Sequence, residues 1–184
     1  MMIVGFSGYA RSGKDTAAEA LSSLGFVRIS FSDKLRDFIY EFNPTVWSDD
    51  SALNTDLRDV IDRHGWNGYK ETIWSKDIRR QLQVLGTECG RKIIDDNIWV
   101  NATFNGLPDG RYALADVRFP NEAKAIKEIG GKVYRITRPG ITAANAHVSE
   151  TALDDYPFDG IIANDIPLTE FKYRVRMVVN ENRY

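Results

Sequence analysis

The segment MIVGFSGYARSGKDT (residues 2–16) contains the strongest structural signal in the chain. An apolar run typical of a buried strand leads into a G-x-x-x-x-G-K pattern from Gly8 to Lys14, and helical apolar spacing follows. Glycines at positions 8 and 13 allow the backbone to wrap closely around phosphate oxygens, while N–H groups and the helix N-terminus supply positive potential. The segment therefore predicts a phosphate-binding loop between a strand and a helix, with Lys14 reaching the phosphates.

The residues after Lys14 leave the expected magnesium ligand open. The Ser or Thr that usually follows this lysine is replaced by Asp15, and the hydroxyl comes one residue later, at Thr16. Thr16 could bind the ion directly, or Asp15 could hold it through its carboxylate or a water, because Mg²⁺ accepts either oxygen ligand. Both residues remain candidates.

Strands and helices alternate along much of the chain. We expect further strands at residues 26–31, 111–117, 132–137 and 160–164, and helices at 121–129 and 168–179. This order predicts a three-layer α/β fold with a mostly parallel sheet of about five strands, whose ligands bind at the carboxyl ends of the strands.

The strand signal disappears from residue 43 to about residue 105, where polar loops alternate with helical stretches. We expect a mostly helical insert there, inside a single domain that covers residues 1–184, and a loop at about 138–149. The net charge of -2 argues against a large duplex-DNA footprint, which needs a surplus of Lys and Arg. We therefore expect no nucleic-acid partner.

The composition also bears on the compartment. The lone cysteine, Cys89, excludes an internal disulfide and a metal site made of several cysteines. No apolar run reaches the roughly 18 residues that cross a bilayer, and the start of the chain lacks the pattern of a signal peptide. We expect a cytoplasmic protein without a membrane partner.

Three charged residues follow strands at the expected ligand edge. Asp116 ends the apolar run YALAD, where a carboxylate could contact a metal directly or through water, although capping the next helix also explains it. Arg118 could bridge two phosphates as charge shifts between them, or form a surface ion pair. Asp33, in FSDKLRDF, could orient an acceptor molecule or cap a helix.

The insert contains a helical pattern with two faces, in SKDIRRQLQVLGTECGRKI. One face is apolar and would pack on the sheet domain, through Ile78, Leu82, Leu85 and Cys89. The opposite face could grip an anionic acceptor, or could simply be solvated, and consists of Arg80, Gln83, Thr87 and Arg91. Gly86 and Gly90 could break the helix.

The motifs RSGKDT, FSDKLR, RRQLQVLGTECGR, DVRFPNEA and HVSE occur in an order that resembles the bacteriophage deoxynucleoside monophosphate kinases. The resemblance implies a nucleoside-monophosphate-kinase fold, ATP with Mg²⁺ as phosphoryl donor, a deoxynucleoside monophosphate as acceptor, and a homodimer in some members. If the chain is phage-encoded, the compartment is the host cytoplasm. Residues 44–72 match nothing in the family, so the resemblance does not name the base.

The resemblance also implies roles for individual residues. Together with Gly8, the loop residues match the donor-binding site: Arg11, Ser12, Gly13, Lys14, Asp15 and Thr16. Arg118 matches a phosphate-binding arginine, and Arg138 looks like an arginine of a lid-like loop that closes over ATP. The matches to the acceptor-binding segment are Arg80, Gln83, Glu88 and Arg91. The expected catalytic set is Lys14, Arg118, Asp15 and Asp33, and the expected metal set is Asp15, Thr16 and Asp116.

Two other hypotheses remain. A P-loop kinase of another small metabolite, such as dephospho-coenzyme A, would share the placement of an aspartate like Asp33. A nucleotide-dependent switch would hydrolyse ATP or GTP without an acceptor, but the sequence has no N-K-x-D guanine-reading motif, and an arginine-rich insert suits an anionic acceptor better.

Overall fold

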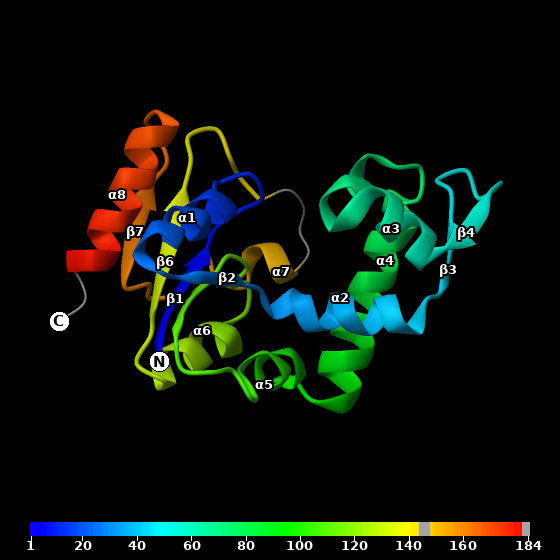
Figure 1. Ribbon diagram of the computed structural model, residues 1–184, viewed down its shortest axis with the longest axis horizontal. Helices are drawn as coiled ribbons and strands as arrows, with labels where there is room; N and C mark the ends of the chain where they lie inside the picture. Colours follow the sequence, from blue (N-terminus) through cyan, green and yellow to red (C-terminus); the bar gives the residue numbers. More distant parts are fainter. Residues whose placement is uncertain (144–147, 182–184) are drawn as a thin grey trace. The chain divides into compact units, whose positions relative to one another are not determined.

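The computed structural model describes residues 1–143 and 148–181 (Figure 1). The chain forms two compact units. The sheet unit contains Met1–Phe31 and the residues from Thr103 on, and the helical unit is Ser32–Ala102. The helical unit begins earlier than the insert expected at about 43–105, and the expectation of one domain over residues 1–184 stays a prediction.

The sheet unit contains five parallel strands in the order β2-β5-β1-β6-β7. Their bounds are β1 Met2–Ser7, β2 Val27–Ile29, β5 Arg111–Leu114, β6 Lys132–Thr137 and β7 Gly160–Ala163. The expected strands are therefore present, most of them shorter than their apolar runs. The predicted α/β fold class is confirmed.

Helices cover both faces of this sheet, and β1 shows why. Val4 and Phe6 point into a core shared with α1 (Lys14–Ala20) and α8 (Leu168–Glu181). Gly5, with the opposite side-chain direction, lies against α6 (Pro120–Glu128), where a Cβ would come within 2.7 Å of Ile126 Cδ1. The alternation of β1 therefore separates two helical layers. The remaining elements of this unit are η1 (Ser22–Leu24) and α7 (Val148–Thr151).

The helical unit contains α2 (Phe31–Phe42, whose first residue belongs to the sheet unit), α3 (Leu57–Gly68), η2 (Tyr69–Glu71), α4 (Ser75–Gln83), η3 (Val84–Ile94) and most of α5 (Ile98–Phe104). It also contains an unexpected antiparallel pair, β3 (Thr45–Trp47) and β4 (Asn54–Asp56). These strands have three residues each, which is too short for the alternating pattern that identifies a strand in a sequence.

The helical unit has its own hydrophobic core. Buried side chains from α2, β3, α3 and α4 meet there, among them Ile39, Val46, Leu57 and Ile78. Leu82 and Leu85 pack against the same cluster. Ile78, Leu82 and Leu85 of the predicted apolar face therefore pack within the helical unit's own core, where the sequence had predicted packing on the sheet domain.

Gly86 and Gly90 do not break their helix. After α4 the chain continues as the π-helix η3, whose wider turn contains both glycines. The indole N–H of Trp99 donates to the Gly86 carbonyl oxygen at 2.8 Å, and a Cβ on Gly86 would come within 2.8 Å of Leu35 Cδ2. A Cβ on Gly90 would come within 3.0 Å of Trp99 Cζ2, so close packing against Leu35 at Gly86 and against Trp99 at Gly90 favours glycine at both positions. In the described part of the chain, no helix is long and apolar enough to span a membrane.

Candidate active site

The phosphate loop between β1 and α1 has a backbone that depends on glycine. The φ angles are 141° at Gly8 and 109° at Gly13, and Arg11 also has a positive φ of 65°. A Cβ on Gly8 would fall on the carbonyl oxygen of Ile136, which belongs to β6. The loop thus turns tightly, and its backbone at Gly8 packs directly against the backbone of the sheet, which only glycine allows.

Lys14 and Ser12 are buried inside this loop. The Lys14 ammonium donates to the carbonyl oxygens of Gly8 and Tyr9, at 2.6 and 2.7 Å. The Ser12 hydroxyl is buried and lacks a hydrogen-bond partner, although almost all buried polar atoms in proteins have one. A phosphate oxygen in the loop would accept that hydroxyl proton, so the loop fits a nucleotide's phosphates.

Two side chains from beyond neighbouring strands support the loop. Asn164, just after β7, donates from Nδ2 to the Ser12 carbonyl oxygen at 2.8 Å. Arg138, the residue after β6, donates from Nη1 to the Arg11 carbonyl oxygen at 3.5 Å. Arg138, expected in a lid-like loop at about 138–149, therefore lies beside the phosphate loop. Residues 144–147 of that loop lie outside the described residues.

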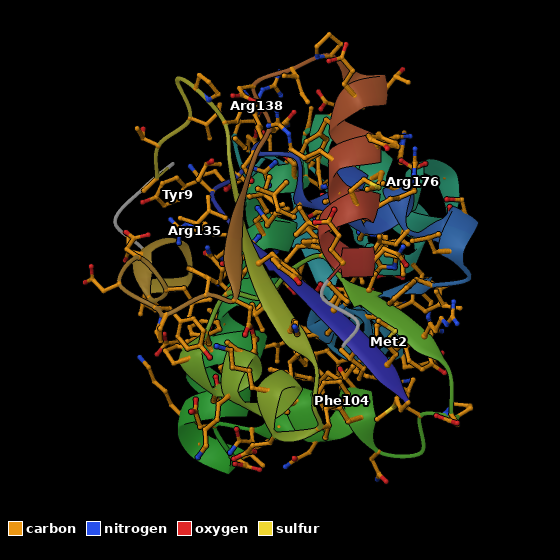
Figure 2. The ribbon with its side chains drawn as sticks, turned by 90° about the vertical axis from the view of Figure 1, so that its left-hand side faces the viewer. Met2, Tyr9, Phe104, Arg135, Arg138 and Arg176 are labelled. Carbon is orange, nitrogen blue, oxygen red and sulfur yellow. The ribbon has the colours of Figure 1, made fainter. Side chains whose placement is uncertain are left out.

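A further group on the same end of the sheet unit was missed by the sequence analysis. Figure 2 shows Tyr9 and Arg135 close together there, far from Met2 at the other end of β1. The Tyr9 hydroxyl donates to Asp154 at 2.9 Å, which raises the pKa of the tyrosine. Partial burial opposes charge on Asp154, but hydrogen bonds from Arg135 and Tyr9 hold the pKa of the carboxyl below its ordinary value. A single arginine within the apolar run of residues 132–137 was the available sequence signal.

The three candidate metal ligands, Asp15, Thr16 and Asp116, have different surroundings. Asp15 forms an exposed ion pair with Arg28 at 2.5 Å. Thr16 lies in the first turn of α1. Asp116, just after β5, accepts from the Ser30 hydroxyl at 2.5 Å and from the Phe31 backbone N–H at 3.1 Å. Mg²⁺ usually binds one or two carboxylates together with substrate phosphates and water, and these oxygens are of the right type.

The structure corrects the alternative that Asp116 caps the next helix in the chain, whereas it leaves the two alternatives for Asp33 as they were. Asp116 binds the first amide of α2, whereas the helix that follows it in the chain, α6, is capped by Glu122, which accepts from the amides of Arg118 and Phe119. Asp33 lies in the first turn of α2, the position that Glu122 takes in α6, and its carboxylate is 3.4 Å from Arg36, so both alternatives for Asp33 stay predictions. The Arg118 side chain is exposed, and its phosphate-binding role stays a prediction.

The acceptor-binding candidates do not form one open face. Arg80 is paired with Asp77 at 2.8 Å, and Glu88 with Lys92 at 2.6 Å, while Gln83 is exposed. Arg91 is only 8% exposed and donates to the carbonyl oxygen of Asp96 at 2.8 Å. Arg91 is therefore not on a solvated face, because π-helical geometry changes the direction of side chains after residue 84, and its acceptor-binding role stays a prediction.

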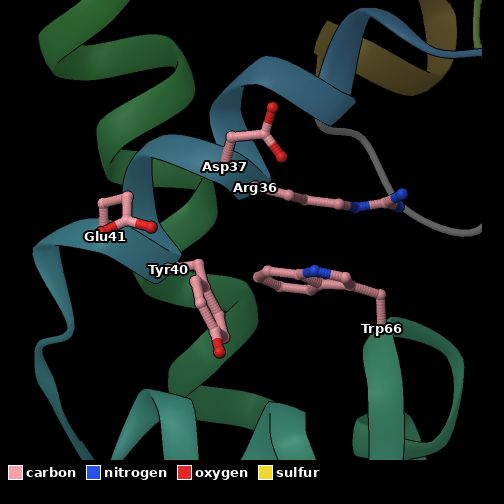
Figure 3. Close-up of a pocket in the computed structure, with 5 residues that line it drawn as sticks. All are labelled: Arg36, Asp37, Tyr40, Glu41 and Trp66. Carbon is pink, nitrogen blue, oxygen red and sulfur yellow. The ribbon is translucent and has the colours of Figure 1, made fainter.

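The helical unit also has a small hollow of about 260 Å³ between α2 and α3 (Figure 3). Arg36 extends over the indole of Trp66, with its guanidinium carbon 5.7 Å from the ring centroid, and Tyr40 stands beside it. The carboxylates of Asp37 and Glu41 complete the lining. Trp66 lies in the stretch 44–72 that matched no motif.

The phosphate loop after β1, the buried Lys14 and an aspartate after the adjacent strand β5 define a P-loop nucleotide-binding protein. A family model described as deoxynucleotide monophosphate kinase matches residues 45–175. The chain is 30% identical to a putative deoxynucleotide monophosphate kinase of Acanthamoeba polyphaga mimivirus, over 93% of this chain and 92% of the relative. It therefore belongs to the deoxynucleotide monophosphate kinase family.

More distant similarities agree with this assignment. The deoxynucleotide monophosphate kinase of Enterobacteria phage T4 is 30% identical over 58% of this chain and 46% of the phage protein, so the chain spans about half of that relative. Among solved structures, dephospho-CoA kinase from Campylobacter jejuni superposes with a TM-score of 0.53 at 17% identity, covering 98% of this chain and 97% of that one. That similarity shows the shared kinase fold.

Proposed function

We propose that the chain transfers the γ-phosphoryl group of ATP to the 5′-phosphate of a deoxynucleoside monophosphate, giving a deoxynucleoside diphosphate and ADP. The observation that carries the proposal is the unpartnered, buried Ser12 hydroxyl inside a loop that already positions Lys14. Such a loop suits the phosphates of a donor nucleotide, and family membership supplies the class of acceptor.

In this proposal the loop amides and Lys14 hold the β- and γ-phosphates. Mg²⁺ would be held by oxygens of the donor phosphates with Asp15, Thr16 or Asp116, and it supplies neutralisation of phosphate charge. Lys14 must leave the carbonyl oxygens of Gly8 and Tyr9 to reach the γ-phosphate. Arg138, beside the Arg11 carbonyl, would lie close to the donor.

The acceptor would bind to the helical unit, through Arg80, Gln83, Glu88 and Arg91, with Asp33 orienting it. An oxygen of the acceptor phosphate attacks the γ-phosphorus while the bond from that phosphorus to the bridging β–γ oxygen breaks. The acceptor phosphate is already ionised near neutral pH, so positioning and charge neutralisation by Lys14 and Arg118 contribute most of the catalysis. A strong general base is not needed.

The test is turnover with MgATP and each of dAMP, dGMP, dCMP and dTMP, their ribose counterparts and dephospho-coenzyme A, beside a reaction without acceptor. We expect ADP formation that depends on a deoxynucleoside monophosphate and is abolished in Lys14→Ala. Turnover of dephospho-coenzyme A alone would support a kinase of another metabolite. Hydrolysis that needs no acceptor would instead support a nucleotide-dependent switch.

A further inference from the structure

We infer that Tyr9, Arg135 and Asp154 form a positioning network that holds the phosphate loop ready for the donor nucleotide. The inference rests on the proposed function, because it concerns the same donor site. None of the three side chains is required by the G-x-x-x-x-G-K pattern, in which position 9 accepts any residue. Their contacts are therefore additional to those that the pattern itself requires.

The network restrains the Tyr9 side chain from two directions. Its hydroxyl donates to Asp154 Oδ1 at 2.9 Å, and its ring lies under the Arg135 guanidinium, 4.7 Å from the ring centroid. Arg135 is itself held, because Nη2 donates to the same Asp154 oxygen at 2.8 Å and Nη1 donates to the Leu153 carbonyl oxygen at 3.1 Å. Phe158 packs on the guanidinium at 5.6 Å.

The backbone of Tyr9 connects this restraint to the reacting end of the loop. Its carbonyl oxygen accepts from the Lys14 ammonium at 2.7 Å and from the Ser12 N–H at 3.1 Å. Holding the Tyr9 ring limits the rotation of its backbone, and so limits the positions that the Ser12 amide and the amides after it can sample. A loop that is ordered before binding loses less conformational entropy when the phosphates arrive.

Because the network is partly exposed to solvent, its effect on nucleotide binding can be distinguished from an effect on the stability of the fold. Tyr9 is half-buried and the Asp154 side chain is 35% exposed, so their bond contributes little to the free energy of unfolding. Arg135, 12% exposed, is the buried member. Loss of the tyrosine hydroxyl should therefore weaken nucleotide binding without a matching loss of stability.

The test is the dissociation constant of MgATP for the full-length Tyr9→Phe variant, measured by calorimetry beside its thermal stability. The restraint can contribute at most the net value of one hydrogen bond, about 0.5–1.5 kcal/mol, so we expect MgATP to bind more weakly by up to about tenfold. In turnover, KM for MgATP should rise by a larger factor than kcat falls. The matched control is Tyr112→Phe, which removes a hydroxyl bonded to the Pro108 carbonyl oxygen at 3.0 Å, at the opposite end of the sheet.

A double-mutant cycle with Asp154→Ala tests the coupling. If the network acts as a unit, Tyr9→Phe should weaken binding far less in the Asp154→Ala background than in the wild-type chain. Additive effects, or MgATP affinity in Tyr9→Phe equal to that of Tyr112→Phe, would overturn the inference. MgATP binding is measured without an acceptor, so it does not depend on the kinase proposal. If that proposal fails, the wild type will show no turnover with any acceptor, while the variants will still bind MgATP more weakly than the wild type by the expected factors.

Discussion

Gly8→Ala should damage the phosphate loop far more than an alanine at another glycine with positive φ. The backbone at Gly8 has a φ of 141°, and a Cβ there would fall on the Ile136 carbonyl oxygen and within 2.8 Å of Ser12 Oγ. The carbonyl belongs to β6 in the middle of the sheet unit, so it cannot move aside. At Gly25, φ is 78° and a Cβ would have nothing within 4 Å.

The two glycine sites predict different losses of folding free energy when each is replaced by alanine. A residue forced into a sparsely populated conformation costs about 1–3 kcal/mol, and overpacking against fixed atoms adds about 1–3 kcal/mol, so Gly8→Ala should cost about 2–6 kcal/mol. Gly25→Ala should cost only the conformational strain, about 1–2 kcal/mol. If the loop shifts to relieve the clash, even 2 kcal/mol corresponds to roughly thirtyfold weaker binding.

The assay compares both variants with the wild type by urea unfolding and by calorimetric titration with MgATP. We expect Gly25→Ala to bind like the wild type and Gly8→Ala to bind at least about thirtyfold more weakly. The reasoning would be refuted by a Gly8→Ala protein whose stability equals that of Gly25→Ala and whose MgATP affinity lies within threefold of the wild type.

Three further predictions concern other sites. Arg118→Ala should lower kcat by on the order of a hundredfold while MgATP affinity stays nearly unchanged, and an unchanged kcat would remove Arg118 from the mechanism. Burial opposes charge on Asp77, but hydrogen bonds from the Trp47 amide, Gln81 and Arg80 lower its pKa below 3.8. Its contribution to stability is therefore present above that pH and lost as pH falls through the lower folded-state pKa. Urea unfolding should show Asp77→Asn about 1–3 kcal/mol less stable than the wild type at pH 7, and this difference in unfolding free energy should become smaller under acid conditions. A difference that does not change with pH would contradict the prediction. Trp99→Phe leaves the buried Gly86 carbonyl oxygen without its indole donor, so its unfolding free energy should fall by about 1–3 kcal/mol, whereas Trp47→Phe, at a site 44% exposed, should change it little. Equal losses in the two variants would argue against the Gly86 contact.

Helices and strands of the sheet unit could be predicted because their signals are local. The strand at residues 132–137 is reproduced residue for residue, and the helix expected at 121–129 begins one residue earlier, at Pro120. Strand β5 is shorter than its apolar run, since apolar side chains also continue beyond the paired residues into Ala115 and Val117. The short β3 and β4 carried no periodic signal at all.

In the candidate site, too, the sequence predicted some parts better than others. The donor loop could be recognised because phosphate binding depends on consecutive backbone groups and on two glycines five residues apart. The acceptor segment was less predictable, because a helix wheel assumes 3.6 residues per turn and η3 is a π-helix. Arg91 is consequently buried, and Arg80 is held by Asp77.

By itself, the amino-acid sequence determined the α/β fold, the phosphate loop with Lys14, and the resemblance to a kinase family. Each of these depends on residues that are neighbours along the chain. Only the tertiary structure decided that Tyr9 meets Asp154, 145 positions away, that Asp116 binds the start of α2, and that Asn164 supports Ser12. Those contacts depend on which strands lie side by side and on side-chain directions at their ends, and no local pattern encodes either.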